Sequence, residues 1–443
     1  MKKRVVSILF FLVGFALFAQ SISLEEVRVL ALANSRSLTK YNLSIRNSVL
    51  DEKSRIYSNL PSLSLGASAS MSLWSAENAA PIENPFDTFS AGASVGVSQR
   101  IFEGGKTLIQ KALNEIASES ARKDALAEYF AVLDSADSAY YAVLEAEATL
   151  EAEEASLEVS NASLAIAEIR HGSGIINPGD YLKALAEKET RENSRNQAKR
   201  NLTLTINKLK ALIGLPLVPT LEQIDFSGYE ELIQRLGTIS DEDADSLYVR
   251  FWELLAKANP ALAKASLASQ RAEKNLKLSK AGYSPSLSAS FSTGLNYSPN
   301  SGFERSGGRV SLSASIPVDF WVTANSVEKS RIALDSAALD YISAESSLDT
   351  ELQTALYNLF SNAGSFLSSR RSLEYAEMHF EYMMERYRLS QASVSELGDA
   401  STLLISSRNS NIKASYGFLQ ALSKLRSLGV IDDEEKLITQ LMY

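Results

Sequence analysis

The stretch "LPSLSLGASASMSLW", from Leu60 to Trp74, decides the fold of this chain. From residue 62 to residue 73, apolar residues at odd positions alternate with serine and glycine at even positions. A period of two predicts a β-strand. A water-facing strand of a soluble protein usually carries Lys and Glu on its wet side. Here that side is small, polar and uncharged, which is typical of a strand that crosses a membrane as part of a β-barrel.

Three further segments share this pattern. The predicted strands cover about 62–75, 90–102, 286–298 and 308–319, and aromatic residues lie near their ends: Trp74, Phe89, Phe102, Tyr297 and Trp321. A soluble sandwich is the alternative interpretation. Four strands cannot close a barrel, because about eight strands form the smallest one, and open edges are excluded from lipid. If these strands span a membrane, several chains must therefore share one barrel.

The sequence contains the same unit twice. "NKLKALIG" from Asn207 matches "SKLRSLGV" from Ser423 at an offset of 216 residues, and the strand segments recur in the same order. Residues 20–214 form the first repeat and residues 246–430 the second. They are joined by a connector at 215–245 and followed by a tail at 431–443. Each repeat is expected to contain a helix, two strands, a very long helix and a return helix.

Heptad spacing indicates coiled-coil packing of the long helices. It recurs in both repeats, at Ala136, Val143, Leu150, Leu157 and Leu164, and at Leu352, Leu359, Phe366, Leu373, Phe380 and Tyr387. The long helices are predicted at about 103–169 and 322–388, each roughly 100 Å long. In the first repeat, the opening helix and the return helix at 181–213 together match this length. They are therefore expected to stack end to end beside the long helix.

The N-terminus predicts export from the cytoplasm. "MKKR" precedes an apolar run that is too short to span a bilayer, so residues 1–19 resemble a cleavable signal peptide. Removing Lys2, Lys3 and Arg4 changes the formal net charge from −9 to −12, which argues against nucleic acid as a partner. The chain has no cysteine, so we do not expect it to be a lipoprotein. With only two histidines, neither of which has a partner at ligand spacing, no metal site, cofactor or catalytic site is predicted.

The helix turns carry the most specific signal. "RHGSGIINPGDYLKA" from Arg170 and "RYRLSQASVSELGDA" from Arg386 resemble the helix-turn motif of the TolC-like outer-membrane efflux protein family. "QRIFEGGK" from Gln99 is similar to that family's junction between strand and helix. The resemblance covers nearly all of the mature chain. It implies an α + β membrane protein that closes as a homotrimer, with a shared 12-stranded β-barrel in the outer membrane and a 12-helix α-barrel in the periplasm.

The same resemblance implies roles for residues near the turns. Glu396 and Asp399 occupy the positions of the acids that ring the periplasmic entrance of the family's channels, and an acid pair at a helix N-terminus is the structural alternative. Asp180 and Tyr387 match a pair that holds the entrance closed. The Arg of another such pair is replaced here by Ala392, and the second turn also departs from the motif at Ser390 and Gly398.

The implied partners are a periplasmic adaptor protein, an inner-membrane pump of the resistance-nodulation-division or ABC type, and outer-membrane lipid. Adaptor docking is expected at the helix tips, around Arg170, Gly174, Ile175, Asn177, Arg386, Ser390, Gln391 and Ser393. The implied function is an exit duct for multidrug efflux or type I secretion, without enzyme activity. A non-pore adhesive or structural coiled-coil surface protein is the alternative.

Overall fold

The computed structural model describes residues 21–74, 81–82 and 84–442. The expected signal peptide at 1–19 lies outside these residues. The described chain divides into two compact units. We call the first the hairpin unit, with residues 21–40, 125–260 and 345–442, and the second the sheet unit, with the described residues of 41–124 and 261–344.

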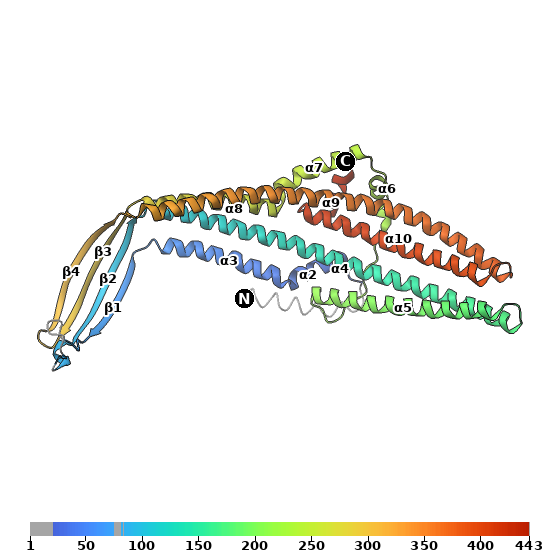
Figure 1. Cartoon of the computed structure of the whole chain (residues 1–443), viewed down its shortest axis with the longest axis horizontal. Helices are drawn as coiled ribbons and strands as arrows, with labels where there is room; N and C mark the ends of the chain where they lie inside the picture. The colour runs from blue at the N-terminus through green and yellow to red at the C-terminus, as the bar shows by residue number, and fades with distance from the viewer. Residues whose placement is uncertain (1–20, 75–80, 83, 443) are drawn as a thin grey trace. The chain divides into compact units, whose positions relative to one another are not determined.

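The sheet unit contains one antiparallel sheet with the strand order β1-β2-β3-β4 (Figure 1). The strands are β1 (Ser62–Ser70), β2 (Ser90–Phe102), β3 (Ser286–Ser298) and β4 (Gly302–Ser315). Their register puts the two predicted residue classes on opposite faces. One row aligns Leu63, Val97, Phe291 and Val310, and the next row, on the other face, aligns Ser62, Ser98, Ser290 and Ser311.

Two strand boundaries differ from the prediction. β1 ends at Ser70 instead of about 75, because the hydroxyl of Thr88, at the end of the 3-10 turn η1 (Pro85–Thr88), bonds to both the N–H and the C=O of Ser72. β4 covers Gly302–Ser315 instead of about 308–319. It begins earlier because Gly302 to Arg305 pair with β3 across a bulge. It ends earlier beside Pro317, which has no backbone donor for a ladder.

The long helices start where glycine or proline ends the preceding strand. α4 (Lys106–Gly172) follows Gly104 and Gly105, both with positive φ, and α9 (Phe320–Arg388) follows Pro317. A Cβ on Gly104 would lie 2.4 Å from the Cβ of Ser284, so this position requires glycine. The sheet unit also includes α8 (Pro260–Lys280), from residue 261 onward, and the short η3 (Ala281–Tyr283), and Lys264 of α8 forms an ion pair with Asp124 of α4 at 2.5 Å.

The hairpin unit is built from two helical hairpins, α4 with α5 (Pro178–Ile213) and α9 with α10 (Val394–Leu428) (Figure 1). The predicted heptad positions Ala136, Val143, Leu352 and Leu359 are buried, as the coiled-coil pattern requires. None of the helices in the described part of the chain combines the length and the apolar character needed to cross a membrane.

Asparagine joins the opening helices to the ends of the return helices in both repeats. Asn34 ends α2 (Leu24–Asn34), and its side-chain amide donates to the carbonyl of Leu212 near the end of α5 at 2.9 Å. Asn259, which caps α7 (Asp241–Ala258), donates in the same way to the carbonyl of Leu428 at 3.3 Å. These contacts satisfy carbonyls that a helix end leaves free, and they agree with the expected end-to-end arrangement. α3 (Arg36–Tyr57) continues from α2.

The connector and the tail pack together. The connector contains η2 (Phe226–Tyr229) and α6 (Glu230–Gly237), and the tail, for which no helix was predicted, contains α11 (Glu434–Met442). The amphipathic α6 buries Leu232, Ile233 and Leu236, while α11 buries Leu437 and Leu441. A backbone bridge between Ile22 and Leu221 ties the start of the connector to the N-terminal segment.

Candidate functional site at the helix tips

The two helix turns share one backbone geometry. In the first, the N–H of Ile175 donates to the carbonyl of Arg170 at 2.8 Å and that of Gly174 to His171 at 3.0 Å. In the second, Gln391 donates to Arg386 at 2.8 Å and Ser390 to Tyr387 at 3.1 Å. This is the Schellman arrangement, which requires a left-handed residue at its turning point. Gly174 has φ 73° and Ser390 has φ 60°, so serine holds a conformation that favours glycine.

The arginines of the two turns, Arg170 and Arg386, make different contacts. Arg170 is buried and donates across to the second hairpin, to the carbonyl of Tyr387 and, at 3.4 Å, to that of Arg388. Its guanidinium carbon also lies 4.5 Å from the centroid of the Tyr387 ring, which is a cation–π contact. Arg386 instead donates to Gln391 of its own turn at 2.8 Å. Only the first arginine therefore ties the two hairpins together.

An apolar cluster lies beneath the turns. Residues from α4, α5, α9 and α10 contribute to it: Ala167, Ala184, Met383, Tyr387, Val394, Leu397 and Ala400. Ala392, where the resemblance expected arginine, packs against this cluster as a partly buried side chain. The four helix ends are thus held by packing as well as by Arg170.

Asp180 and Tyr387 lie close enough to interact but do not share a hydrogen bond among the described contacts. Asp180 is the third residue of α5, and its carboxylate accepts from the side chain of Asn177 at 2.8 Å, while Asn177 caps the helix. The Tyr387 hydroxyl donates to the carbonyl of Ser163 at 3.5 Å. Burial raises the pKa of Tyr387, Arg170 opposes this, and the charge of Asp180 adds to it.

The two candidate gate acids are in different settings. Glu396 forms a capping box with Ser393: its N–H donates to the serine hydroxyl at 3.2 Å, and its carboxylate accepts from the serine N–H at 2.7 Å. These bonds lower the pKa of Glu396. Asp399 is exposed one turn further along α10, and its side chain makes no hydrogen bond or ion pair with any described residue. Helix capping explains the presence of an acid at Glu396 but not at Asp399.

Arg170, expected among the docking residues, is instead buried against the second hairpin, whereas several of the other candidates are exposed. Ile175 is 65% exposed, Gln391 is exposed, and nothing lies within 4 Å of the position of a Cβ on Gly174. Gly398, where the motif expects leucine, lies against α5 instead, since a Cβ there would be 2.9 Å from Glu187 Oε2. α5 and α10 are also joined by a hydrogen bond from Lys183 Nζ to Ser395 Oγ at 2.6 Å. Glycine at 398 thus permits these helices to approach closely.

A second polar centre lies in the hairpin unit, away from the turns, and sequence reasoning missed it. Asp137 of α4 is fully buried and accepts from Arg28 Nε at 2.6 Å, from Arg28 Nη2 at 2.9 Å and from Arg426 Nη2 at 2.6 Å. The hydroxyl of Ser423 donates to the same carboxylate at 2.5 Å. Both arginines, from α2 and α10, are buried, and both form ion pairs with this one carboxylate.

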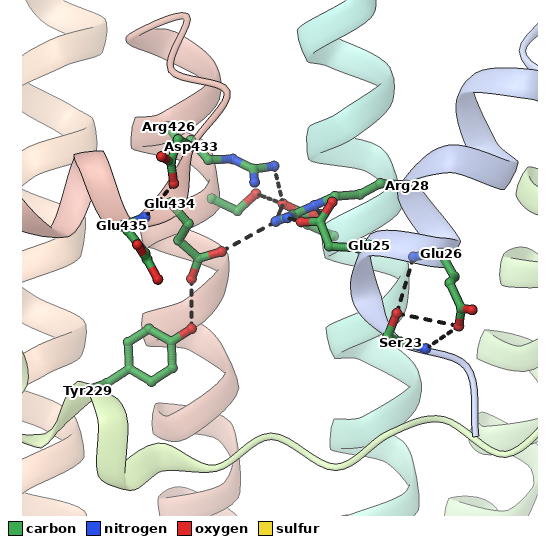
Figure 2. A network of polar contacts seen from close by, with 11 residues as sticks. Ser23, Glu25, Glu26, Arg28, Tyr229, Arg426, Asp433, Glu434 and Glu435 are labelled. Atoms are coloured by element: carbon green, nitrogen blue, oxygen red, sulfur yellow. Dashed lines mark hydrogen bonds and ion pairs between the residues drawn. The ribbon is translucent and has the colours of Figure 1, made fainter. Parts of the chain in front are cut away.

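Glu434 extends this centre to the tail (Figure 2). Its carboxylate lies 3.5 Å from Arg28 Nη2 and accepts from the Tyr229 hydroxyl at 2.7 Å. Burial acts to lower the pKa of Arg28, but the hydrogen bond and charge of Asp137, together with the charge of Glu25, raise it overall. Burial raises the pKa of Tyr229, and Glu434 adds to the shift. Five segments, α2, α4, η2, α10 and α11, therefore meet at this centre, and sequence spacing alone could not bring them together.

Within the described residues, no group of three or more His, Cys, Asp or Glu side chains could hold a metal ion.

Comparison with known proteins agrees with this architecture. The chain resembles the outer membrane protein TolC of Escherichia coli K12, with 23% identity over 444 residues that cover 96% of this chain and 85% of TolC. The fold matches the outer membrane channel CmeC of Campylobacter jejuni with a TM-score of 0.75 and 16% identity, covering 94% of this chain and 89% of CmeC. It also matches the outer membrane protein VceC of Vibrio cholerae with a TM-score of 0.75 and 15% identity, covering 92% and 96% of the two chains.

The structural matches establish the fold, and the family model establishes the family. Residues 27–215 and 252–429 match the model of the outer membrane efflux proteins, one segment for each repeat. The sheet with its two contrasting faces, the paired hairpins and these two matched segments together lead to one conclusion: the chain belongs to the outer membrane efflux protein family.

Proposed function

We propose that this protein is the exit duct of a tripartite efflux or type I secretion system, and that three copies form it. In this proposal the sheets of three chains close one barrel in the outer membrane, and the helices form a tunnel in the periplasm. The duct carries out no chemistry; it receives substrate from an inner-membrane pump through a periplasmic adaptor.

The observation that carries the proposal is the sheet. Among the described strands, β1 and β4 each have one neighbour, so each leaves one edge unpaired. Large apolar side chains remain exposed on one face, with Leu65 78% and Val310 79% exposed. Unpaired edges and an exposed apolar face are both costly in water and are both removed when several sheets close a barrel in lipid.

Cysteine cross-linking tests the shared barrel without background, since the chain has no cysteine. One cysteine replaces Leu65 in β1, and a second replaces Val310, Leu312 or Ala314 in β4. If β1 of one chain pairs with β4 of the next, at least one pair will give covalent dimers and trimers on oxidation. Leu65→Cys combined with Phe291→Cys is the control, because β3 has neighbours on both sides and should give none. A detergent-extracted protein that sizes as a soluble monomer would instead support an adhesive or structural protein.

The exposed acids near the tip support a cation-selective entrance. Three copies each of Glu396 and Asp399 in a narrow mouth would focus negative potential and favour cations. In a planar bilayer, neutralising both with Glu396→Gln and Asp399→Asn should lower cation selectivity. Glu374→Gln, an exposed acid elsewhere on α9, is the matched control. Unchanged cation selectivity in the double variant would contradict the assignment of Glu396 and Asp399 to the entrance.

The exposed surface of the turns supports adaptor docking. Ile175→Trp and Gln391→Trp enlarge exposed side chains next to the left-handed positions, so the turns themselves can keep their geometry. Both should reduce co-purification with the adaptor and efflux in cells. Leu204→Trp alters an α5 residue that is also exposed, at 54%, but lies away from the turns, and it should have no effect. Normal co-purification of both tip variants would contradict docking at this surface.

A further inference from the structure

One charged residue stands out on the serine and glycine face of the sheet. Residues directly opposite in an antiparallel ladder lie on the same face. The register aligns Ser64 with Gly96, Gly96 with Ser292, and Ser292 with Arg309. Arg309 therefore lies on the same face as the small polar side chains. Ser292 is the seventh residue of the 13-residue strand β3, so this row crosses the middle of the sheet.

The rows beside Arg309 contain short side chains. On one side the row is Ser62, Ser98, Ser290 and Ser311, and on the other it is Gly66, Ser94, Gly294 and Ser306. The hydroxyls of Ser62 and Ser98 share a hydrogen bond across the strands at 2.7 Å. The long guanidinium side chain is exposed and stands on a face of hydroxyls and glycines.

Arg309 has no ion-pair partner among the described residues. Of the other charged residues on this face, Arg100 is paired with Glu103 at 3.1 Å. Glu304 lies four ladder positions from Arg309, beyond the β-bulge and near the strand end. At about 3.3 Å per residue this separation exceeds a Debye length of about 8 Å at physiological salt. The charge of Arg309 is therefore neither neutralised locally nor balanced nearby.

A neighbouring chain in a shared barrel would not neutralise it either. There the free edge of β4 would pair with β1 of the next chain, and β1, "SLSLGASAS", contains no charged residue. The opposite face of β4 carries Arg305, which aligns with Leu295 on the apolar side. The two arginines of β4 thus lie on opposite faces, in different surroundings.

We propose that Arg309 determines specificity within the barrel, where three copies form a cationic ring that favours anionic solutes such as carboxylates and sulfonates over cations. This rests on the proposed function, since it requires the serine and glycine face to line a water-filled lumen. At about 7 Å from one unit positive charge in water, and before screening by salt, the local concentration of a monovalent anion rises about threefold and that of a monovalent cation falls about threefold. The ratio of anion to cation at one site then changes roughly tenfold.

A local thiol probe tests this without depending on whether the tip is open. Ser311→Cys places the only thiol of the full-length protein two residues from Arg309 and on the same face. The protein is reconstituted in lipid vesicles, and the rates of modification by a sulfonate and by a trimethylammonium methanethiosulfonate reagent are compared. We expect the anion-to-cation rate ratio to fall several-fold when Arg309→Gln is added. Arg309→Lys should preserve the ratio because it keeps the charge.

Two controls separate this inference from the proposed function. Arg305→Gln removes an equal charge from the opposite face and should leave the ratio at Ser311→Cys unchanged. Val310→Cys lies on the apolar face and should be protected by lipid. Suppose that Ser311→Cys reacts and Val310→Cys is protected, but that Arg309→Gln leaves the rate ratio unchanged. The proposed role of Arg309 is then wrong, while the proposed membrane-spanning duct is still supported. If both cysteines react equally fast, the membrane-spanning barrel is wrong and the inference fails with it.

Discussion

The guanidinium of Arg170 lies over the ring of Tyr387, with its carbon 4.5 Å from the ring centroid, and also donates to the carbonyl of the same residue. One buried side chain thus contacts both the ring and the backbone at the end of α9. Arg386, its counterpart in the second repeat, makes no such contact across hairpins, because it donates within its own turn. The duplicated motif has therefore acquired an asymmetric role.

Arg170→Ala should loosen the second turn. It removes charged hydrogen bonds to the carbonyls of Tyr387 and Arg388, worth about 1.5–3 kcal/mol, together with the cation–π contact. Hydrogen exchange of the 387–391 amides should accelerate accordingly. Arg386→Ala, the matched control, should speed exchange less in the same segment. Equal effects of the two variants would contradict the asymmetry.

Ser390→Gly should stabilise the second turn. Serine pays a cost at φ 60° that glycine does not, about 1 kcal/mol. The reciprocal change, Gly174→Ser, should destabilise the first turn by a similar amount, because space is open there and only the backbone angle opposes it. Thermal midpoints of the two variants should move in opposite directions. If the two thermal midpoints move in the same direction, the left-handed backbone angle does not determine the stability of these turns.

The capping box predicts a pH dependence near the tip. The pKa of Glu396 is lowered in the folded chain by its bonds to Ser393, with a smaller contribution from Arg386. Its contribution to stability is therefore present above the unfolded value, 4.5, and is lost as the pH falls through the lower folded value. Exchange rates of the 393–397 amides, corrected for intrinsic rates, should rise across this interval. Glu396→Gln, which can still accept from the Ser393 N–H but does not titrate, should abolish the dependence, and its persistence in that variant would exclude the capping box as the cause.

The sheet was largely predictable because alternation is a local property of the sequence. The faces predicted for Leu63 and Val97 agree with the observed register. The predicted end of β1 was wrong because it depends on a non-local bond, from the backbone of Ser72 to Thr88. The predicted start of β4 was wrong because its pairing with β3 continues past a bulge, whereas its end beside Pro317 follows from a local signal that the prediction overlooked. A side chain at a helix end can take a backbone hydrogen bond that would otherwise join two strands, and the alternation of apolar and polar residues does not reveal this.

The turn residues were located by their motif, but their contacts were not. Arg170 and Arg386 look equivalent in the sequence, and only the packing of the two hairpins makes one buried. Asn34 and Asn259 donate to carbonyls at the ends of helices that are distant in the sequence, which no local pattern predicts. The centre at Asp137 had no sequence signal, since its partner Arg426 lies 289 residues away.

Asp137→Asn should be the most damaging single substitution in the hairpin unit. It leaves Arg28 and Arg426 buried without a full counter-charge, and breaking such a pair typically costs about 3–5 kcal/mol. The thermal midpoint should fall, and limited proteolysis should cut first near α11, because Glu434 reaches this centre through Arg28. Glu25→Gln is the matched control: this acid also pairs with Arg28, but its side chain is 76% exposed, so the variant should behave like the parent protein. Equal midpoints for Asp137→Asn and Glu25→Gln would mean that the buried centre does not hold the five segments together.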